Sequence, residues 1–368
     1  MPRRRRDDDD DDDDGGGGGE AYQRHHHDKR PRPPPPQQKH LYLVLDDWDR
    51  GYSIHKLDVD LDDAGVIHGG GGGPAVRFAA PGSSCDARFF RMRGGSIAVV
   101  SGAAPTLVYD TGAAALTVES PLPGLLAGGL AIAMPGGQRL YALTSLGERF
   151  PRAFEVLSPG GGWSWKNASV ATPPPPFEEA VAAYAVHPDG HTVFVSTSGD
   201  GGGGGTYTLD TKRGEWRRHG DWLLPFHGQG FFDAELDAWV GLPRHGDTIC
   251  ACQVPSRGGA RPLEWDTMDD DAVVPSWKKS RRRRGRRRRA TLTYMGDSKF
   301  CVVDSVECDG DDDGGDGVVE PPQCEVHVAV FGLKYNRRGE LKATARRATG
   351  SFRVPKHFSW FSPVAFWM

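Results

Sequence analysis

The segment from Trp222 to Asp233, WLLPFHGQGFFD, carries side chains that could recognise a ligand. It is rich in aromatic residues, and His227 and Asp233 lie near one another in it. Aromatic rings provide rigid contact area in binding sites. Two interpretations stay open. Either Trp222, His227 and Asp233 contact a ligand or partner from a loop, or the rings fill space between structural repeats and His227 caps a turn.

A run of basic residues is the second candidate site. Clusters of five to eight Lys or Arg are typical of nuclear import signals and of nucleic-acid contacts, because these cations pair with acidic grooves or phosphates. Asp269, Asp270 and Asp271 offer an intramolecular partner instead, and a loop expansion without a selected role is the third interpretation. The candidate import residues are Arg281, Arg282, Arg283, Arg284, Arg286, Arg287, Arg288 and Arg289.

Motifs for known enzyme chemistry are absent from the sequence. It has no Gly-x-Ser-x-Gly elbow, no His-Glu-x-x-His and no kinase set. Cys250 and Cys252 are separated by one residue, whereas a zinc site normally needs two to four intervening residues and a second pair. We expect both to be buried thiols on a strand. The sequence therefore predicts no catalytic residue, no cofactor and no metal.

The charge of the chain is divided between two unlike parts. The net charge is −4, but ten of the 45 Lys and Arg lie within Lys278–Arg289. Without that run, 35 cations face 49 acidic residues, a net charge of −14. A body this acidic is not expected to wrap nucleic acid. The longest apolar stretch, Leu125–Met134, is too short to span a membrane, and no apolar segment follows Met1. These features and the few cysteines predict an intracellular protein of the cytoplasm, and the basic run adds the nucleus as a second expected compartment.

Low-complexity blocks interrupt the sequence. Residues 1–38 have almost no apolar surface to bury, so they predict a disordered tail. Residues 39–368 predict one domain, with disordered loop inserts near 199–205, 266–289 and 308–322.

Between the blocks, short β-branched or aromatic runs are bounded by Gly, Pro and Asp, which predicts an all-β fold. The runs group into six units. Unit by unit, the runs begin at His40 and Tyr52; Ser96, Thr106 and Ala115; Arg139, Ala153 and Trp163; His191 and Thr206; Ala238 and Thr248; and Phe300 and Glu325.

The spacing and turns of these units predict a β-propeller of six blades. Most units recur at about the 40 to 50 residues typical of one blade. Asp110-Thr111 and Asp210-Thr211 predict turns in which Asp caps its own backbone and a following Gly takes positive φ. A later Trp packs between blades, which resembles the kelch repeat, although the double glycine of that repeat is not regular here. A pair of β-sandwiches is the alternative fold.

The C-terminal half carries a more specific resemblance. The stretches Gly214–Leu242, Ala290–Val306 and Val330–Leu341, with the ending FSPVAFWM, resemble a family of grass proteins known as domain of unknown function 1668. The resemblance covers about residues 40–368. It implies a plant intracellular protein with propeller-like repeats, and it carries no activity, cofactor or catalytic residue.

These observations favour a non-catalytic, monomeric propeller that binds another protein. Repeated blades place variable loops around a channel, which suits recognition through many contacts. One alternative is a propeller enzyme or carbohydrate binder that uses the Trp222–Asp233 segment. The other is a nuclear protein that works through the Arg-rich segment by import or nucleic-acid contact.

Overall fold

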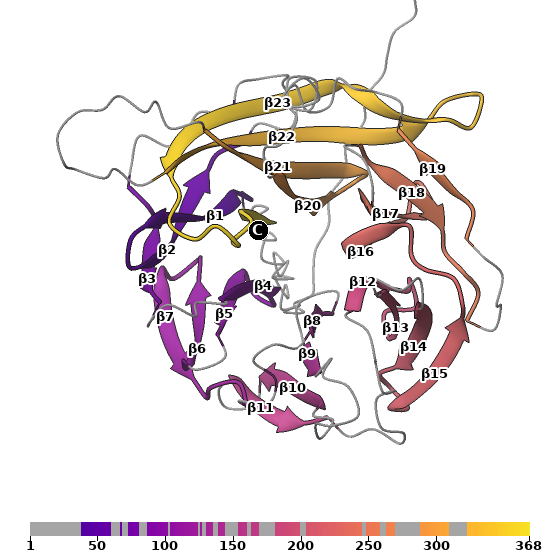
Figure 1. Ribbon diagram of the computed structural model, residues 1–368, viewed down its shortest axis with the longest axis horizontal. Coiled ribbons are helices and arrows are strands. Elements are labelled where there is room, and N and C mark those ends of the chain that lie inside the picture. The colour runs from indigo at the N-terminus through magenta and orange to yellow at the C-terminus, as the bar shows by residue number, and fades with distance from the viewer. Residues whose placement is uncertain are drawn as a thin grey trace, which may run out of the picture. The chain divides into compact units, whose positions relative to one another are not determined.

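The structure is a computed structural model that describes residues 38–59, 67, 73–80, 87–101, 104–123, 126, 130–134, 139–143, 154–159, 163–168, 181–198, 204–244, 248–257, 263–268, 288–308 and 322–368. Lys39–Met368 forms one compact unit. The described part of this unit is built from β-strands, which form six four-stranded antiparallel blades around a central axis (Figure 1).

The strands follow one another from blade to blade along the chain. Blade 1 contains β1 (Leu41–Trp48), β2 (Gly51–Leu57) and β3 (Val76–Ala79), and blade 2 contains β4 (Arg88–Met92), β5 (Ser96–Val100), β6 (Thr106–Asp110) and β7 (Ala115–Glu119). Blade 3 contains β8 (Leu130–Ala133), β9 (Leu140–Leu143), β10 (Phe154–Pro159) and β11 (Trp163–Asn167). Blade 4 contains β12 (Val181–Val186), β13 (Thr192–Ser198), β14 (Gly204–Asp210) and β15 (Glu215–Gly220).

The last two blades and a closing strand complete the ring. Blade 5 contains β16 (Phe226–Asp233), β17 (Ala238–Pro243), β18 (Cys250–Gln253) and β19 (Trp265–Thr267). Blade 6 contains β20 (Arg288–Gly296), β21 (Lys299–Glu307), β22 (Gln323–Tyr335) and β23 (Leu341–Pro355). The closing strand β24 (Val364–Trp367) pairs antiparallel with β1 and becomes the innermost strand of blade 1. The innermost strands β12 and β16 also pair with each other, in parallel.

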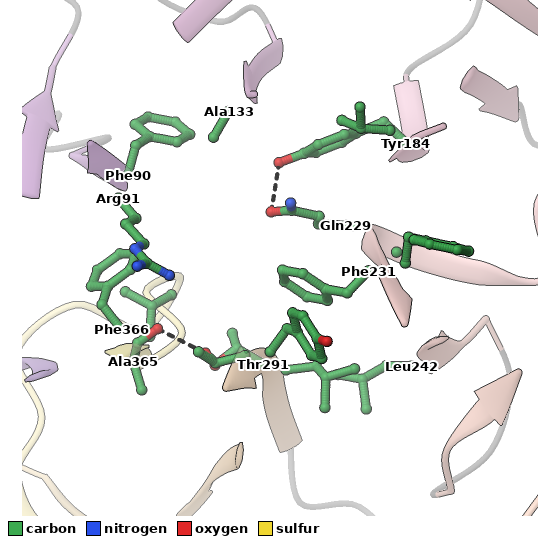
Figure 2. A pocket seen from close by; sticks show the side chains of 18 of the residues that line it. Phe90, Arg91, Ala133, Tyr184, Gln229, Phe231, Leu242, Thr291, Ala365 and Phe366 are labelled. Carbon is green, nitrogen blue, oxygen red and sulfur yellow. Dashed lines mark hydrogen bonds between the residues drawn. The ribbon is translucent and has the colours of Figure 1, made fainter. Parts of the chain in front are cut away.

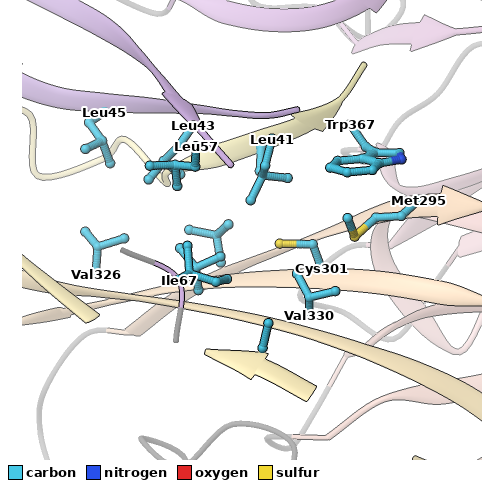
Figure 3. Packing of buried hydrophobic residues seen from close by; sticks show 14 of the residues in the cluster. Leu41, Leu43, Leu45, Leu57, Ile67, Met295, Cys301, Val326, Val330 and Trp367 are labelled. Carbon is cyan, nitrogen blue, oxygen red and sulfur yellow. The ribbon is translucent and has the colours of Figure 1, made fainter. Parts of the chain in front are cut away.

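The hydrophobic core lies between the blades rather than inside any one of them. The described residues form six buried clusters, and each cluster joins two neighbouring blades. Figure 3 shows the cluster between blades 1 and 6, where Leu41 and Trp367 face Met295 and Cys301. Middle strands such as β5 are buried along their whole length because a blade packs on each of their faces.

The structure confirms the all-β, six-bladed propeller and rejects the pair of β-sandwiches. The units recognised in the sequence all contain the second and third strands of a blade. The innermost strands were missed. Most importantly, Phe226–Asp233 is the inner strand β16 and not a loop.

The boundaries of the expected inserts also need correction. Gly204 and Gly205 belong to β14, residues 266–267 to β19, and Arg288 and Arg289 to β20. The rest of the inserts and the expected tail, apart from a few flanking residues, lie outside the described residues.

The predicted Asp turns are present in the structure. The Asp110 carboxylate accepts hydrogen bonds from the backbone N–H groups of Gly112 and Ala113, and Asp210 makes the same bonds one hundred residues later. The left-handed position at the end of each turn is filled differently. It is Gly214 (φ 66°) in blade 4, as predicted, but Ala114 (φ 51°) in blade 2, where the prediction of a glycine at positive φ is wrong.

This difference predicts opposite effects for two exchanges. Ala114→Gly should raise the free energy of unfolding by about 1 kcal/mol, because glycine adopts positive φ without steric cost, and Gly214→Ala should lower it by about 1 kcal/mol or more. Denaturant unfolding of both variants measures the effects. Equal shifts of the same sign would contradict this account of the turns.

A buried ion pair joins the two ends of the ring. The Lys356 ammonium lies 3.2 Å from the Asp46 carboxylate and also donates to the carbonyl of Phe361 at 3.0 Å. Asp46 accepts a further bond from the Phe358 N–H at 2.8 Å. Both charged side chains are almost completely buried, so each depends on the other for its solvation.

Removing either partner should therefore destabilise the protein strongly. We expect Lys356→Met or Asp46→Asn to lower the free energy of unfolding by about 3–5 kcal/mol, because the remaining partner loses its main stabilising contact inside the protein. The free energy of unfolding of the double variant should fall by much less than the sum of the falls in the two single variants. Additive losses in a double-mutant cycle would show that the two groups do not depend on each other.

Candidate functional site

The six innermost strands surround a central cavity of about 620 Å³. This volume is in the range of about 300–1,000 Å³ that is typical of small-molecule sites. Each blade contributes residues from its inner strand, and the turn after β12 adds His187, Pro188 and Gly190. Figure 2 shows the side chains converging on the space between the blades.

The cavity wall is mainly apolar and aromatic. Phe90, Phe231 and Phe366 come from three different blades, and Tyr184 and Leu242 add to the same wall (Figure 2). Among the described lining residues there is no Asp or Glu. Arg91 is the charged side chain among them that keeps its charge at every physiological pH. The cavity therefore combines apolar walls with positive charge.

Arg91 enters the cavity from β4. The side chain is exposed, and the protein around it still removes part of its water, which lowers the pKa of the guanidinium. Among the described residues, none makes an ion pair or a hydrogen bond with this side chain. Its five N–H donors are thus available to a ligand.

Two further polar groups are fixed on the opposite side of the cavity. The Tyr184 hydroxyl donates to Gln229 Oε1 at 3.0 Å, and no described residue accepts a hydrogen bond from the Gln229 amide nitrogen (Figure 2). Burial raises the pKa of Tyr184 well above its ordinary value, so the phenol stays neutral and keeps donating. Burial, helped by Asp233, likewise raises the pKa of Tyr294 to about 12.

The three residues singled out in Trp222–Asp233 do not meet at one site. His227 lines the cavity, and its Nδ1 bonds the Pro243 carbonyl at 3.1 Å. Trp222 is buried in the core between blades 4 and 5. Asp233 is fully buried and binds the N–H and the hydroxyl of Ser298 in the next blade. Only His227 is placed to touch a ligand in the cavity.

Two glycines make room for an aromatic ring on the inner strand of blade 5. A Cβ on Gly230 would come within 2.2 Å of the Phe226 ring, and one on Gly241 within 2.5 Å. The ring of Phe226 therefore packs directly against the backbone at both glycines. Gly228 has φ 66° at the point where the pairing of β16 with β17 shifts register. The regular pairing of the two strands is interrupted just after His227, which lines the cavity.

The other predicted sites have different outcomes. Arg281–Arg284, Arg286 and Arg287 lie outside the described residues, and Arg288 and Arg289 form the start of β20. Cys250 and Cys252 are buried strand thiols, as predicted, and burial raises the pKa of the Cys250 thiol to about 12. In the described part of the chain, no group of three or more His, Cys, Asp or Glu could hold a metal ion.

A Ser-His-Asp grouping on blade 1 was not recognised in the sequence. His55 Nε2 lies 2.8 Å from Asp47 and 3.1 Å from Ser53 Oγ, and Ser53 also bonds Asp47. Hydrolases place the base between nucleophile and carboxylate, with one contact on each ring nitrogen. Here both contacts use the same nitrogen, and Ser53 is fully buried. The grouping fixes the end of blade 1.

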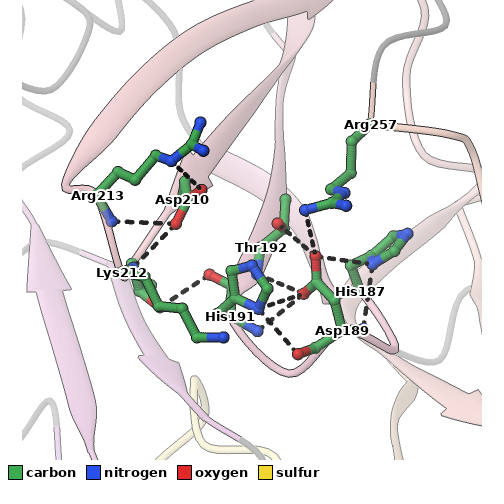
Figure 4. A network of polar contacts seen from close by, with 9 residues as sticks. His187, Asp189, His191, Thr192, Asp210, Lys212, Arg213 and Arg257 are labelled. Carbon is green, nitrogen blue, oxygen red and sulfur yellow. Dashed lines mark hydrogen bonds and ion pairs between the residues drawn. The ribbon is translucent and has the colours of Figure 1, made fainter.

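A second polar network lies beside the cavity, at the turn after β12 (Figure 4). The Asp189 carboxylate accepts bonds from the N–H groups of His191 and Thr192 at 2.9 and 2.8 Å and from the Thr192 hydroxyl at 2.7 Å. His187 and Arg257 lie within 3.6 Å of it. Burial alone would raise the pKa of Asp189, but these bonds outweigh it and hold the pKa below its usual value.

This network predicts a pH dependence of stability. Because the pKa of Asp189 is lower in the folded than in the unfolded protein, its contribution is complete above about pH 4 and is lost as the pH falls through the folded-state value. Asp189→Asn should remove this part of the acid sensitivity. Urea unfolding of the wild type and of Asp189→Asn between about pH 7 and pH 3 measures this effect. A difference in the free energy of unfolding that stays the same at every pH would contradict the prediction.

Comparisons with known proteins give the fold little further detail. TolB from Acinetobacter baumannii is 12% identical over 89% of this chain and 66% of its own, with a TM-score of 0.41. A chain of a nidogen/laminin complex is 12% identical over 73% of this chain and 88% of its own, with a TM-score of 0.45. The WD40 domain of SCAP from fission yeast is 10% identical over 88% and 89%, with a TM-score of 0.35. A comparison with curated proteins found no match.

The family comparison covers most of the sequence. The family described as "Protein of unknown function (DUF1668)" matches residues 38–352, which is nearly the whole propeller. None of the described residues forms a helix long and apolar enough to cross a membrane. By the extent of the match, the chain is a member of the DUF1668 family.

Proposed function

We propose that this propeller is a non-catalytic protein that binds a partner protein along the outer edge of blade 2. The edge strand β7 is exposed along nearly its whole length. Leu116 and Val118, on one face of it, are 44% and 66% exposed. Among the described residues β7 pairs only with β6, so its outer backbone groups are free. A partner strand could add to this edge through main-chain hydrogen bonds and cover both apolar side chains.

The outer strand of blade 4 is protected against such pairing. In blade 4, β15 carries Glu215, Arg217 and Arg218, and Arg217 pairs with Glu215 at 2.8 Å. Charged side chains on an edge strand discourage association with other chains. From Ala115 to Val118, β7 has no charge. The contrast between β7 and β15 is the observation that carries the proposal.

The cavity chemistry supports a non-catalytic role. Glycoside hydrolases generally use two carboxyl groups at the scissile bond, and the described cavity lining contains none. A carbohydrate binder using Trp222 and Asp233 has little support because both side chains are buried. The nuclear role of the Arg-rich run, a plant cell and kelch-type repeats remain expectations from the sequence.

A lysine on the free edge should abolish partner binding. Val118→Lys places a charge where the partner strand would pair, while the exposed position leaves folding intact. We expect affinity purification with the wild-type chain to recover a protein in stoichiometric amount, and Val118→Lys to recover at least tenfold less.

Val118→Thr is the matched control, because it keeps a β-branched, uncharged residue at the edge and should retain the partner. Equal recovery with Val118→Lys would overturn the edge as the binding site. Recovery of no stoichiometric protein by the wild-type chain under several conditions would overturn the proposed function.

A further inference from the structure

A separate feature of the molecule is the positive charge in its central cavity. Arg91 projects from β4 of blade 2, and the aromatic rings of Phe231 and Phe366 come from blades 5 and 1 (Figure 2). Guanidinium groups form two parallel hydrogen bonds with a carboxylate, and such charge-assisted bonds are about twice as strong as neutral ones. Arg91 is an exposed side chain that lines the cavity and has no partner among the described residues, so an anion that enters the cavity can pair with it directly.

We propose that the central cavity binds a small organic acid, a single carboxylate attached to a planar apolar ring system. The carboxylate pairs with Arg91, and the ring system lies among Phe90, Phe231 and Phe366. The amide nitrogen of Gln229, held by the Tyr184 hydroxyl, is the second fixed donor of the site. The aromatic walls select a flat apolar body, because stacked and edge-on ring contacts add to the energy of burial.

The distribution of charge limits the ligand to one negative group. Arg91 is the one Lys or Arg among the described lining residues. His227 uses Nδ1 on the Pro243 carbonyl, and the Nδ1 of His187 lies 3.1 Å from Asp189. Polyphosphates are held by several cations or by glycine-rich loops at helix starts, and the described lining has neither. A monocarboxylate matches this arrangement.

The experiment compares two probes of nearly the same shape, 2-naphthoate and its neutral amide, 2-naphthamide. Isothermal titration calorimetry with the full chain should give one saturable site for 2-naphthoate and at least tenfold weaker binding of 2-naphthamide. This comparison needs no variant, so it holds whatever a substitution does to folding. Equal affinities, or no binding of 2-naphthoate at millimolar concentration, would overturn the proposal.

Variants of Arg91 then test whether its charge binds the carboxylate. Arg91→Gln should weaken 2-naphthoate at least tenfold and leave 2-naphthamide unchanged, and Arg91→Lys should lose only part of the affinity because it keeps the charge without the planar fork. Arg93→Gln is the matched control, since Arg93, like Arg91, is an exposed arginine but lies two residues later and outside the described cavity lining. Unchanged 2-naphthoate affinity in Arg91→Gln would overturn the role of Arg91.

One more variant separates this site from the proposed function. Val118→Lys lies on the outer strand of blade 2, so it should bind 2-naphthoate with wild-type affinity even though it loses the partner protein. Loss of 2-naphthoate binding in this variant would show that the probe binds at the edge, which would overturn the cavity site.

Discussion

Closure of the ring is the constraint on which the rest of the structure depends. The strand β24 completes blade 1 beside β1, and the Asp46–Lys356 pair fixes the segment that leads into it. Because each hydrophobic cluster of the described residues is shared by two blades, an open ring would expose the clusters on both sides of the gap. The same closure sets the inner strands at the spacing that creates the cavity. Stability and the candidate binding site therefore have one structural origin.

Much of the fold could be predicted because the middle strands of the blades can be recognised from their own sequence alone. Runs such as Ser96–Val100 are apolar and β-branched, since blades cover both of their faces. The Asp110 and Asp210 turns follow from local hydrogen bonding alone. Inner strands are harder to recognise: Arg88–Met92 contains two arginines and Phe226–Asp233 two glycines. Their conformation depends on neighbouring blades that are distant in sequence.

The cavity could not be predicted for the same reason. Arg91 is one arginine among many in the sequence, and only the ring brings it opposite Gln229 and Phe231. Conversely, the segment with the richest local chemistry is mostly core. Trp222 and Asp233 are conspicuous in the sequence because a blade interface needs a large ring and a buried turn cap. Of the residues chosen there, His227 alone reaches the cavity, where the pairing of β16 with β17 is interrupted.

The pairing of β1 with β24 also affects synthesis of the chain. Asp46 leaves the ribosome 310 residues before Lys356, so the first blade has neither its inner strand nor its buried counter-charge for most of translation. During that time Leu41, Leu43 and the aromatic residues near Tyr52 lack partners that come from the last segment. Such exposed apolar surface attracts chaperones and promotes aggregation. Production of this protein in a foreign host should therefore depend on a low growth temperature and on the supply of chaperones more than on the stability of the finished ring.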